Sequence, residues 1–181
     1  YVRMITDRGH EVGNHSLTHE PWLHLYPKDR IREELLNTHN AITQVVGQEP
    51  RGFRGPGFSW SEDLLDVLLE LGYLYDASTL PTFIGPLARM YYFWTASLDK
   101  EERAQRRKLF GTIADGFRPV RPYVWSLPGE RELPELPVTT MPVFRTPFHL
   151  SYLIYLNRYS PWLMERYLHV AVMMCKLTGT Q

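Results

Sequence analysis

Two histidines four residues apart constrain this chain more than any other feature. Residues 9–19 read Gly-His-Glu-Val-Gly-Asn-His-Ser-Leu-Thr-His, and they place His15 and His19 directly after a short segment typical of a buried strand. If the chain turns helical after Asn14, the two imidazoles share one face, because residues i and i+4 are neighbours on a helix. Two neutral imidazoles so placed can take two corners of a divalent-metal site. The alternative is a pair of hydrogen-bonded structural histidines, since this spacing also arises by chance.

The first 78 residues alternate strands, loops and helices. Helices are expected at residues 2–8, ended by Gly9, from an Asp29 cap to Gly47, and from a Ser61 cap to Gly72. Short strands are expected at residues 51–54 and 73–75, each followed by residues that can carry chemistry. This order predicts a parallel α/β fold, in which ligands bind at the carboxyl ends of strands.

The remaining residues differ in character. A charged amphipathic helix is expected at residues 99–109, with its charges on a solvated face. Residues 119–147 are rich in proline, with extended pieces at residues 123–127, 136–140 and 143–145. Since proline cannot donate to a central ladder, we expect these pieces at an edge of a sheet or in loops. Ser160 and Pro161 start a strongly apolar helix over residues 162–177.

Composition excludes several classes of function. The 181 residues carry 20 basic and 20 acidic side chains, so net charge gives no argument for a nucleic-acid partner. A single cysteine, Cys175, excludes an internal disulfide and a cysteine-built zinc site, and we expect a buried thiol. The longest apolar region, residues 148–177, is interrupted by charged residues, so no transmembrane segment is predicted.

Three stretches resemble a known family. Residues 9–19 resemble the second signature of the polysaccharide deacetylases (family-4 carbohydrate esterases, the NodB-homology domain), which reads His-Ser/Thr-x-x-His. The resemblance implies that His15 and His19 bind the metal. Residues 53–58, Phe-Arg-Gly-Pro-Gly-Phe, resemble the third signature, Arg-x-Pro-Tyr/Phe or Arg-x-Pro-Gly. Residues 73–78 occupy the place of the fourth, an aspartate at a strand end, although no tryptophan follows closely.

The resemblance implies roles for five further residues. Arg54 would orient the catalytic aspartate and keep it ionised, as a nearby positive charge does. The backbone N–H of Gly57 would stabilise the developing oxyanion. Because Gly57 replaces the usual aromatic residue, Phe58 or Trp60 is expected to stack on the sugar instead. Asp76 would support the catalytic acid or the arginine.

Each of these residues also has a structural alternative. Arg54 can be a surface arginine paired with Glu62 or Asp63, and Asp76 can be an N-cap or turn aspartate. His149 lies in an aromatic-rich loop that can line the sugar cleft, although a structural role is favoured. The remaining histidines show no partner pattern: His10, His24, His39 and His169.

Two family signatures have no counterpart in these residues. The first, Thr-Phe-Asp-Asp, supplies the general base and the carboxylate ligand and precedes the second; Asp7, on a helix, is a poor substitute. The fifth, Leu-x-His, supplies the general acid, and no histidine follows His169. The expected fold is thus a distorted (β/α)7 barrel of the polysaccharide-deacetylase type, incomplete at both ends. Residues 1–181 form one domain, with a metal-binding and arginine-loop half (1–78) and an aromatic- and proline-rich half (79–181).

The expected function is metal-dependent hydrolysis of an N-acyl group, usually acetyl, from an amino-sugar polysaccharide or glycoconjugate. Zinc suits two histidines and an oxygen ligand, and cobalt, nickel or iron bind with comparable geometry. Without base and acid, the 181 residues alone are expected to be inactive. The resemblance implies a cell-envelope or extracytoplasmic location.

Other functions stay open at this point. A lipid-linked sugar at a membrane surface is one substrate hypothesis. It is drawn from the apolar helix at 162–177 and from the aromatic residues Trp60, Phe83 and 91–94. A catalytically inactive carbohydrate-binding module on the same fold is the main alternative function. A purely structural metal predicts that chelation unfolds the protein. A serine hydrolase is disfavoured, because no Gly-x-Ser-x-Gly occurs.

Overall fold

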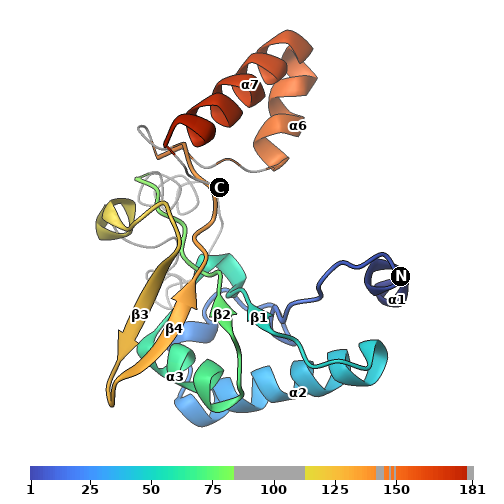
Figure 1. Cartoon of the computed structure of the whole chain (residues 1–181), viewed down its shortest axis with the longest axis vertical. Coiled ribbons are helices and arrows are strands. Elements are labelled where there is room, and N and C mark those ends of the chain that lie inside the picture. Colours follow the sequence, from blue (N-terminus) through green and yellow to red (C-terminus); the bar gives the residue numbers. More distant parts are fainter. Residues whose placement is uncertain (84–112, 142–144, 147, 149, 179–181) are drawn as a thin grey trace, which may run out of the picture.

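The computed structural model describes residues 1–83, 113–141, 145–146, 148 and 150–178, which form helices around a mixed sheet (Figure 1). The helices are α1 (Val2–Thr6), α2 (Lys28–Val46), α3 (Glu62–Glu70), α6 (Leu150–Tyr159) and α7 (Pro161–Thr178), and the 3-10 turns are η1 (Leu23–Leu25), η2 (Pro56–Phe58) and η4 (Ile113–Phe117). The strands are β1 (Gly52–Phe53), β2 (Tyr75–Asp76), β3 (Tyr123–Leu127) and β4 (Arg131–Glu135).

The sheet has the order β1-β2-β4-β3. β1 pairs parallel with β2 and β2 parallel with β4, while β3 and β4 form an antiparallel hairpin. Asn14 extends the sheet beyond β1 as a parallel bridge to Phe53. Its N–H donates to the carbonyl of Gly52 (2.9 Å), and its carbonyl accepts from the N–H of Arg54 (3.0 Å). Four segments therefore end at the same edge of the sheet, as parallel strands do.

The side chain of Asn14 joins this edge to the helical layer. Asn14 is 1% exposed. Its Nδ2 donates to the carbonyl of Leu35 in α2 (3.0 Å) and to the hydroxyl of Tyr73 (2.7 Å), and its Oδ1 accepts from the N–H of Ser16 (2.9 Å). Burial raises the pKa of Tyr73 to about 12, so its hydroxyl stays protonated at neutral pH.

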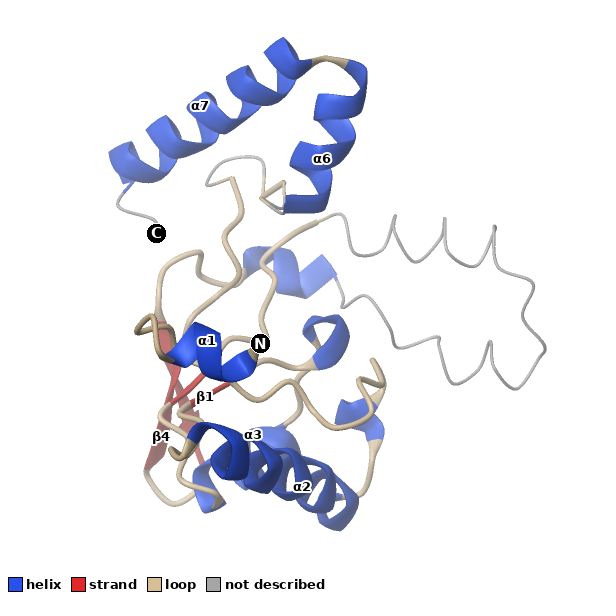
Figure 2. Ribbon diagram, turned by 90° about the vertical axis from the view of Figure 1, so that its right-hand side faces the viewer, coloured by secondary structure: helices blue, strands red, loops and turns tan. Residues whose placement is uncertain are grey.

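Helices α2 and α3 pack side by side at one end of the molecule (Figure 2). Ser61 caps α3 by accepting from the N–H of Leu64 (3.2 Å), as its sequence predicts. The core combines leucines of both helices with Phe53 of β1 and Leu133 of β4. Burying large apolar side chains is the dominant stabilisation of such a layer.

Several expectations for residues 1–78 are confirmed, and three are wrong. The segment before His15 is not a buried strand: residues 10–13 form no strand, and only Asn14 makes an isolated β-bridge. α1, α2, β1, α3 and β2 all form near their predicted positions, and α2 ends at Gly47, which is left-handed (φ +79°). However, α2 begins after Pro27, so Asp29 lies in its first turn and is not the cap. No helix follows Asn14: residues 15–19 are a bent loop.

The α/β class is confirmed, whereas a closed (β/α)7 barrel is not. The described strands form one open mixed sheet. The expected extended pieces are partly displaced: β3 lies at the predicted residues 123–127, but β4 occupies residues 131–135 and not 136–140. Pro134 is tolerated in β4 because β4 pairs with β2 only through Asp76 and Glu135. No ladder hydrogen bond to β2 therefore requires an N–H at Pro134.

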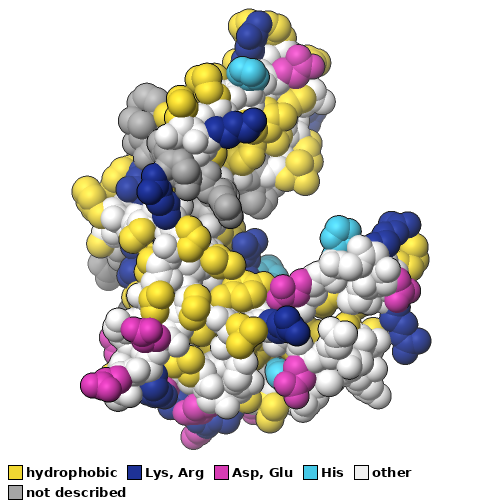
Figure 3. Space-filling model, in the orientation of Figure 1, with side chains coloured by type: hydrophobic (Ala, Val, Ile, Leu, Met, Phe, Trp, Pro, Cys, Tyr) yellow, Lys and Arg dark blue, Asp and Glu magenta, His cyan; other side chains and the backbone are white. Residues whose placement is uncertain are grey.

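Helices α6 and α7 form a hairpin at the end of the molecule opposite α2 and α3 (Figures 1 and 2). Ser160 caps α7, since its hydroxyl accepts from the N–H of Leu163 (3.2 Å). The hairpin exposes apolar side chains (Figure 3), among them Ile154, Trp162 and Met173. No described helix is both long and apolar enough to span a membrane. Cys175 is half-buried, less than expected.

Other expectations fall outside the described residues. The charged helix at residues 99–109 and the aromatic residues 91–94 lie there, as does most of the extended piece at 143–145.

We expect Asn14→Ala to lower the free energy of unfolding by about 2–3 kcal/mol, because it removes one hydrogen-bond partner of buried Tyr73 and the side-chain partners of the Leu35 carbonyl and the Ser16 N–H. The exposed amide of Asn40 on α2 gives the matched control, and Asn40→Ala should change stability by less than about 0.5 kcal/mol. Urea denaturation measures both. Equal effects of the two substitutions would contradict the assigned role of Asn14.

Candidate functional site

The loop after Asn14 brings His15 and His19 together. Their ring centroids lie 4.7 Å apart with an interplanar angle of 71°. Both residues are exposed. The predicted pairing of the two rings is therefore present, although a bent loop and not a helix produces it. This loop, Ser16 to His19, is called the histidine loop below.

One hydrogen bond fixes the orientation of His15. Its Nδ1 lies 2.6 Å from the carbonyl oxygen of Arg54. A carbonyl can only accept, so Nδ1 carries the hydrogen, and in the neutral ring Nε2 keeps its lone pair. Metal-binding histidines commonly donate their second nitrogen to a carbonyl in this way. The geometry therefore leaves Nε2 of His15 as the atom that can bind a metal.

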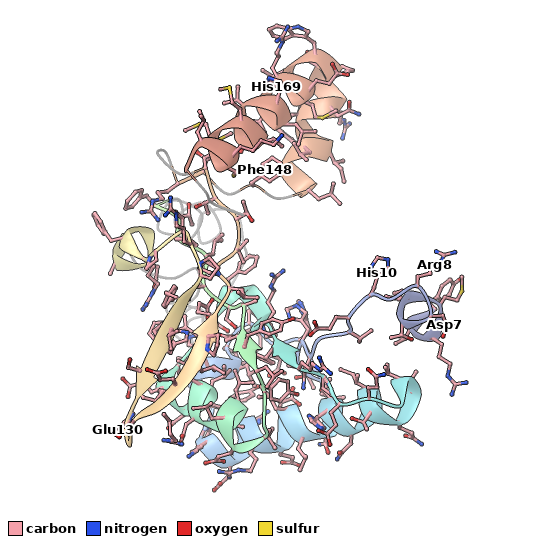
Figure 4. The ribbon with its side chains drawn as sticks, in the orientation of Figure 1. Asp7, Arg8, His10, Glu130, Phe148 and His169 are labelled. Atoms are coloured by element: carbon pink, nitrogen blue, oxygen red, sulfur yellow. The ribbon has the colours of Figure 1, made fainter. Side chains whose placement is uncertain are left out.

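The two imidazoles fit two corners of a metal site. Among the described residues, no group of three or more His, Cys, Asp or Glu side chains could hold a metal ion. His10 lies on the segment that leads away toward α1, and His169 lies on α7 at the other end of the molecule (Figure 4). Neither joins the pair. A complete site needs a further ligand beside these two imidazoles.

Arg54 follows β1 at the same edge. Its Nε donates to the carbonyl of Ala77 (3.1 Å), just beyond β2. No described ion pair joins Arg54 to Glu62 or Asp63, so the structure does not support the alternative of a surface ion pair. The guanidinium is thus directed along the edge where parallel strands end.

The loop after Arg54 requires its glycines. A Cβ at Gly55 would lie 2.0 Å from the carbonyl oxygen of Ser59, which is backbone and cannot easily yield. Gly57 is left-handed (φ +65°), and Phe58 is too (φ +57°). The N–H of Gly55 donates to Oγ of Ser78 (2.7 Å). The sequence Gly-Pro-Gly therefore encodes a tight turn that the strand-end residues of β2 hold in place.

Asp76 is fully buried beneath this turn. The hydroxyl of Ser78 donates to Oδ1 of Asp76 and accepts from Gly55, so it connects the aspartate with the arginine loop. Asp76 lies inside β2, which excludes an N-cap. Because it is 0% exposed, it cannot contact a polymer substrate directly. Its position agrees with the expected support of the arginine loop, not with a catalytic residue that touches substrate.

A second buried carboxyl group faces Asp76. Glu135 is its cross-strand partner and is also 0% exposed. Glu135 accepts from the N–H (2.9 Å) and hydroxyl (2.6 Å) of Thr79 and from the indole of Trp125 (2.9 Å). Burial first, and then the Glu135 carboxylate, raise the pKa of Asp76 well above its usual range. Asp76 therefore holds its proton more tightly than an exposed aspartate does.

The expected substrate-binding aromatic residues lie near this edge. Phe58 is half-buried in η2. Trp60 packs against Trp125 with centroids 4.5 Å apart, and the guanidinium of Arg118 lies 4.3 Å from the Trp60 ring centre. His149 lies outside the described residues. Contact with a sugar stays a prediction for all three expected residues.

Sequence reasoning missed four residues that shape the site: Glu34, Tyr73, Ser78 and Glu135. Each is buried, and each acts through a partner distant in the sequence. The sequence did carry a signal for Ser78, since Asp-Ala-Ser lies at the end of a predicted strand. The other three carry no local pattern that distinguishes them from ordinary core or surface residues.

The N-terminal part of the chain is similar to known proteins. Residues 1–75 match the family model described as polysaccharide deacetylase. A peptidoglycan deacetylase of Helicobacter pylori is 33% identical over 85 residues, which cover 47% of this chain and 29% of that protein. A chitooligosaccharide deacetylase of Bradyrhizobium is 32% identical over 72 residues, 39% of this chain and 32% of that protein. Residues 1–75 are therefore similar to the polysaccharide deacetylase family.

The deacetylase match includes both histidines and the arginine loop. The chain spans about a third or less of the length of the two curated relatives, 29% and 32%. The fold is similar to a crystal structure from Mycobacterium smegmatis described as a polysaccharide deacetylase, with a TM-score of 0.51 and 23% identity. That likeness covers 76% of this chain and 35% of the other, and it supports the α/β fold alone.

We expect the raised pKa of Asp76 to appear in the pH dependence of stability. The folded state holds this proton more tightly than the unfolded state, whose pKa is near 3.8, so stability is greatest below pH 3.8 and falls as pH rises through the folded pKa. The slope for one group reaches about 1.4 kcal/mol per pH unit. Asp76→Asn keeps an acceptor for Ser78 but cannot ionise, so it should become progressively more stable than wild type as pH rises.

Urea denaturation between pH 4.5 and 8 measures the difference. Asp63→Asn, at an exposed position in the first turn of α3, is the control and should show no such trend. A wild-type protein that gains stability over the variant with rising pH would contradict a raised pKa of Asp76.

Proposed function

We propose that this chain holds the metal of a metal-dependent hydrolase that removes an N-acyl group, most simply acetyl, from an amino sugar in a polysaccharide or glycoconjugate. The observation that carries the proposal is the contact between His15 and His19, beside Arg54 at one edge of the sheet. The match of residues 1–75 to the polysaccharide deacetylase family model supports the reaction class.

Zinc is the metal we propose, because imidazole nitrogens suit it and a tetrahedral site leaves room for water. Cobalt, nickel or iron bind similar donors. Nε2 of His15, with His19 beside it, would hold the ion. When bound there, a divalent metal supplies Lewis-acid polarisation of the acyl carbonyl and an acidified water. We propose no described residue as the general base, the general acid or the oxygen ligand.

The chain's own residues position the reacting groups. Arg54 would orient the base and favour its ionised form, because an adjacent positive charge lowers the pKa of a carboxyl group. The N–H of Gly57 would donate to the developing oxyanion, and a backbone donor keeps this ability whatever the side chain. Ser78 and Asp76 hold the turn that presents both groups. We further propose that the open sheet belongs to a distorted barrel.

Two of the relatives, named as a peptidoglycan deacetylase and a chitooligosaccharide deacetylase, support a proposal for the substrate class. We propose an N-acetylated amino-sugar polymer for this protein as well. Phe58, Trp60 and His149 are the proposed sugar contacts. An aromatic ring face offers apolar area without demanding a particular linkage.

The test is acetate release by the intact protein from N-acetylated chitooligosaccharides and from peptidoglycan. Chelation should abolish release, and zinc should restore it. The double substitution His15→Ala/His19→Ala should lower kcat/KM by at least about 1000-fold, since electrostatic activation of the carbonyl is lost. His10→Ala is the control and should leave activity unchanged. Acetate release that survives chelation would refute the proposal, and sugar binding without release would favour the inactive binding module.

Arg54→Ala should lower kcat by about 10–1000-fold, because it removes the charge proposed to keep the base ionised. Its pH profile should shift to higher pH, since a base that loses a positive neighbour has a higher pKa. Arg51→Ala, an exposed arginine just before β1, is the matched control. Zinc content should be unchanged in both variants. A loss of kcat with an unshifted profile would contradict the role given to Arg54.

A further inference from the structure

The histidine loop adopts an unfavourable backbone conformation at both ends. Ser16 (φ +61°) and His19 (φ +57°) are left-handed without being glycine. Such residues cost on the order of 1–3 kcal/mol each and persist only where the surroundings impose them. A loop that brings two histidine rings to 4.7 Å therefore needs an anchor outside itself.

Bonds within the loop do not supply that anchor. The N–H of Ser16 donates to Oδ1 of Asn14, and the N–H of His19 donates to Oγ of Ser16 (3.0 Å). Both bonds join residues two or three apart, so they shape the turn without fixing it to the protein. His15 itself is tied to the carbonyl of Arg54, which leaves the position of His19 to be explained.

Glu34 of α2 ties the second half of the loop to the fold. Its Oε1 accepts both from the N–H of Thr18 (3.0 Å) and from the hydroxyl of Thr18. Glu34 is 9% exposed, and a carboxylate so deeply buried is costly without donors that satisfy it. Two donors from one threonine meet that need and fix the residue directly before His19.

Leu35, the next residue of α2, binds the residue before the other histidine. The carbonyl of Leu35 accepts from the side chain of Asn14, directly before His15. Adjacent residues of α2 therefore form hydrogen bonds with the two residues that precede His15 and His19.

We infer that Glu34 is a positioning residue for metal binding, which holds His19 at the distance and orientation that let both imidazoles reach one ion. The inference rests on the proposed function, because it assumes that the pair binds a metal. It adds a residue outside the matched signature patterns. The bonds to Thr18 also account for the burial of an acidic side chain in α2.

Zinc affinity of the intact protein tests this role without an activity assay. Glu34→Ala should weaken zinc binding by about 10–100-fold, the usual loss when a partner that orients metal ligands is removed. Glu34→Gln keeps an acceptor oxygen of the same shape and should lose only about threefold, because a neutral acceptor makes weaker bonds than a charged one. Thr18→Val should weaken binding too, and Thr18→Val with Glu34→Ala should be less than additive.

Two controls separate positioning from general destabilisation. Glu33→Ala removes the neighbouring, exposed glutamate of α2 and should leave zinc affinity unchanged. Leu65→Ala removes a fully buried side chain of α3 and should lower the denaturation midpoint without weakening zinc binding to the folded protein.

The outcomes distinguish the inference from the proposed function. A wild-type protein that binds no zinc refutes both. Stoichiometric zinc in wild type with unchanged affinity in Glu34→Ala refutes the inference alone. So does a loss of affinity in Leu65→Ala as large as that in Glu34→Ala, since the effect would then follow stability and not the position of His19.

Discussion

The side chain of Asn14 is the contact on which the site depends. One buried amide connects the edge of the sheet with α2, with Tyr73 and with the start of the histidine loop. Because a buried amide is costly unless all its bonds are made, the three partners are held in one arrangement. The backbone of Asn14 meanwhile aligns the loop with β1, so that the residues after Asn14 and after Phe53 emerge together. That alignment brings His15 next to Arg54.

The histidine pair and the arginine loop form one unit for the same reason. The carbonyl of Arg54 orients the ring of His15, while its guanidinium reaches the next segment along the edge. Beneath them, the hydroxyl of Ser78 donates to buried Asp76 and accepts from the N–H of Gly55, so it links the two residues. Burial and the adjacent Glu135 raise the pKa of Asp76, so this support lies where a second carboxylate charge is disfavoured. The polar network stabilises the geometry of the edge and leaves the exposed imidazoles available.

The sequence predicted those parts of the structure that depend on local chemistry. Helix caps such as Ser61, the left-handed end at Gly47 and the order of strands and helices all follow from neighbouring residues. The histidine pair was found from a motif, yet its loop was expected to be helical, because left-handed Ser16 and His19 depend on distant partners. For the same reason Glu34 and Glu135 gave no signal: each is defined by a contact made only in the folded chain. The displaced β4 also depends on a distant partner. Pro134 can lie within β4 because β2 pairs with β4 only at Glu135.

The central claim is that His15 and His19 bind one ion, with His15 using Nε2. Anomalous diffraction at the zinc edge from crystals of the intact protein, grown with zinc, tests it most directly. The account predicts a single strong peak about 2.0–2.1 Å from Nε2 of His15 and at the same distance from a ring nitrogen of His19. A peak elsewhere, at His10 or His169, or zinc bound to only one of the pair, would contradict it.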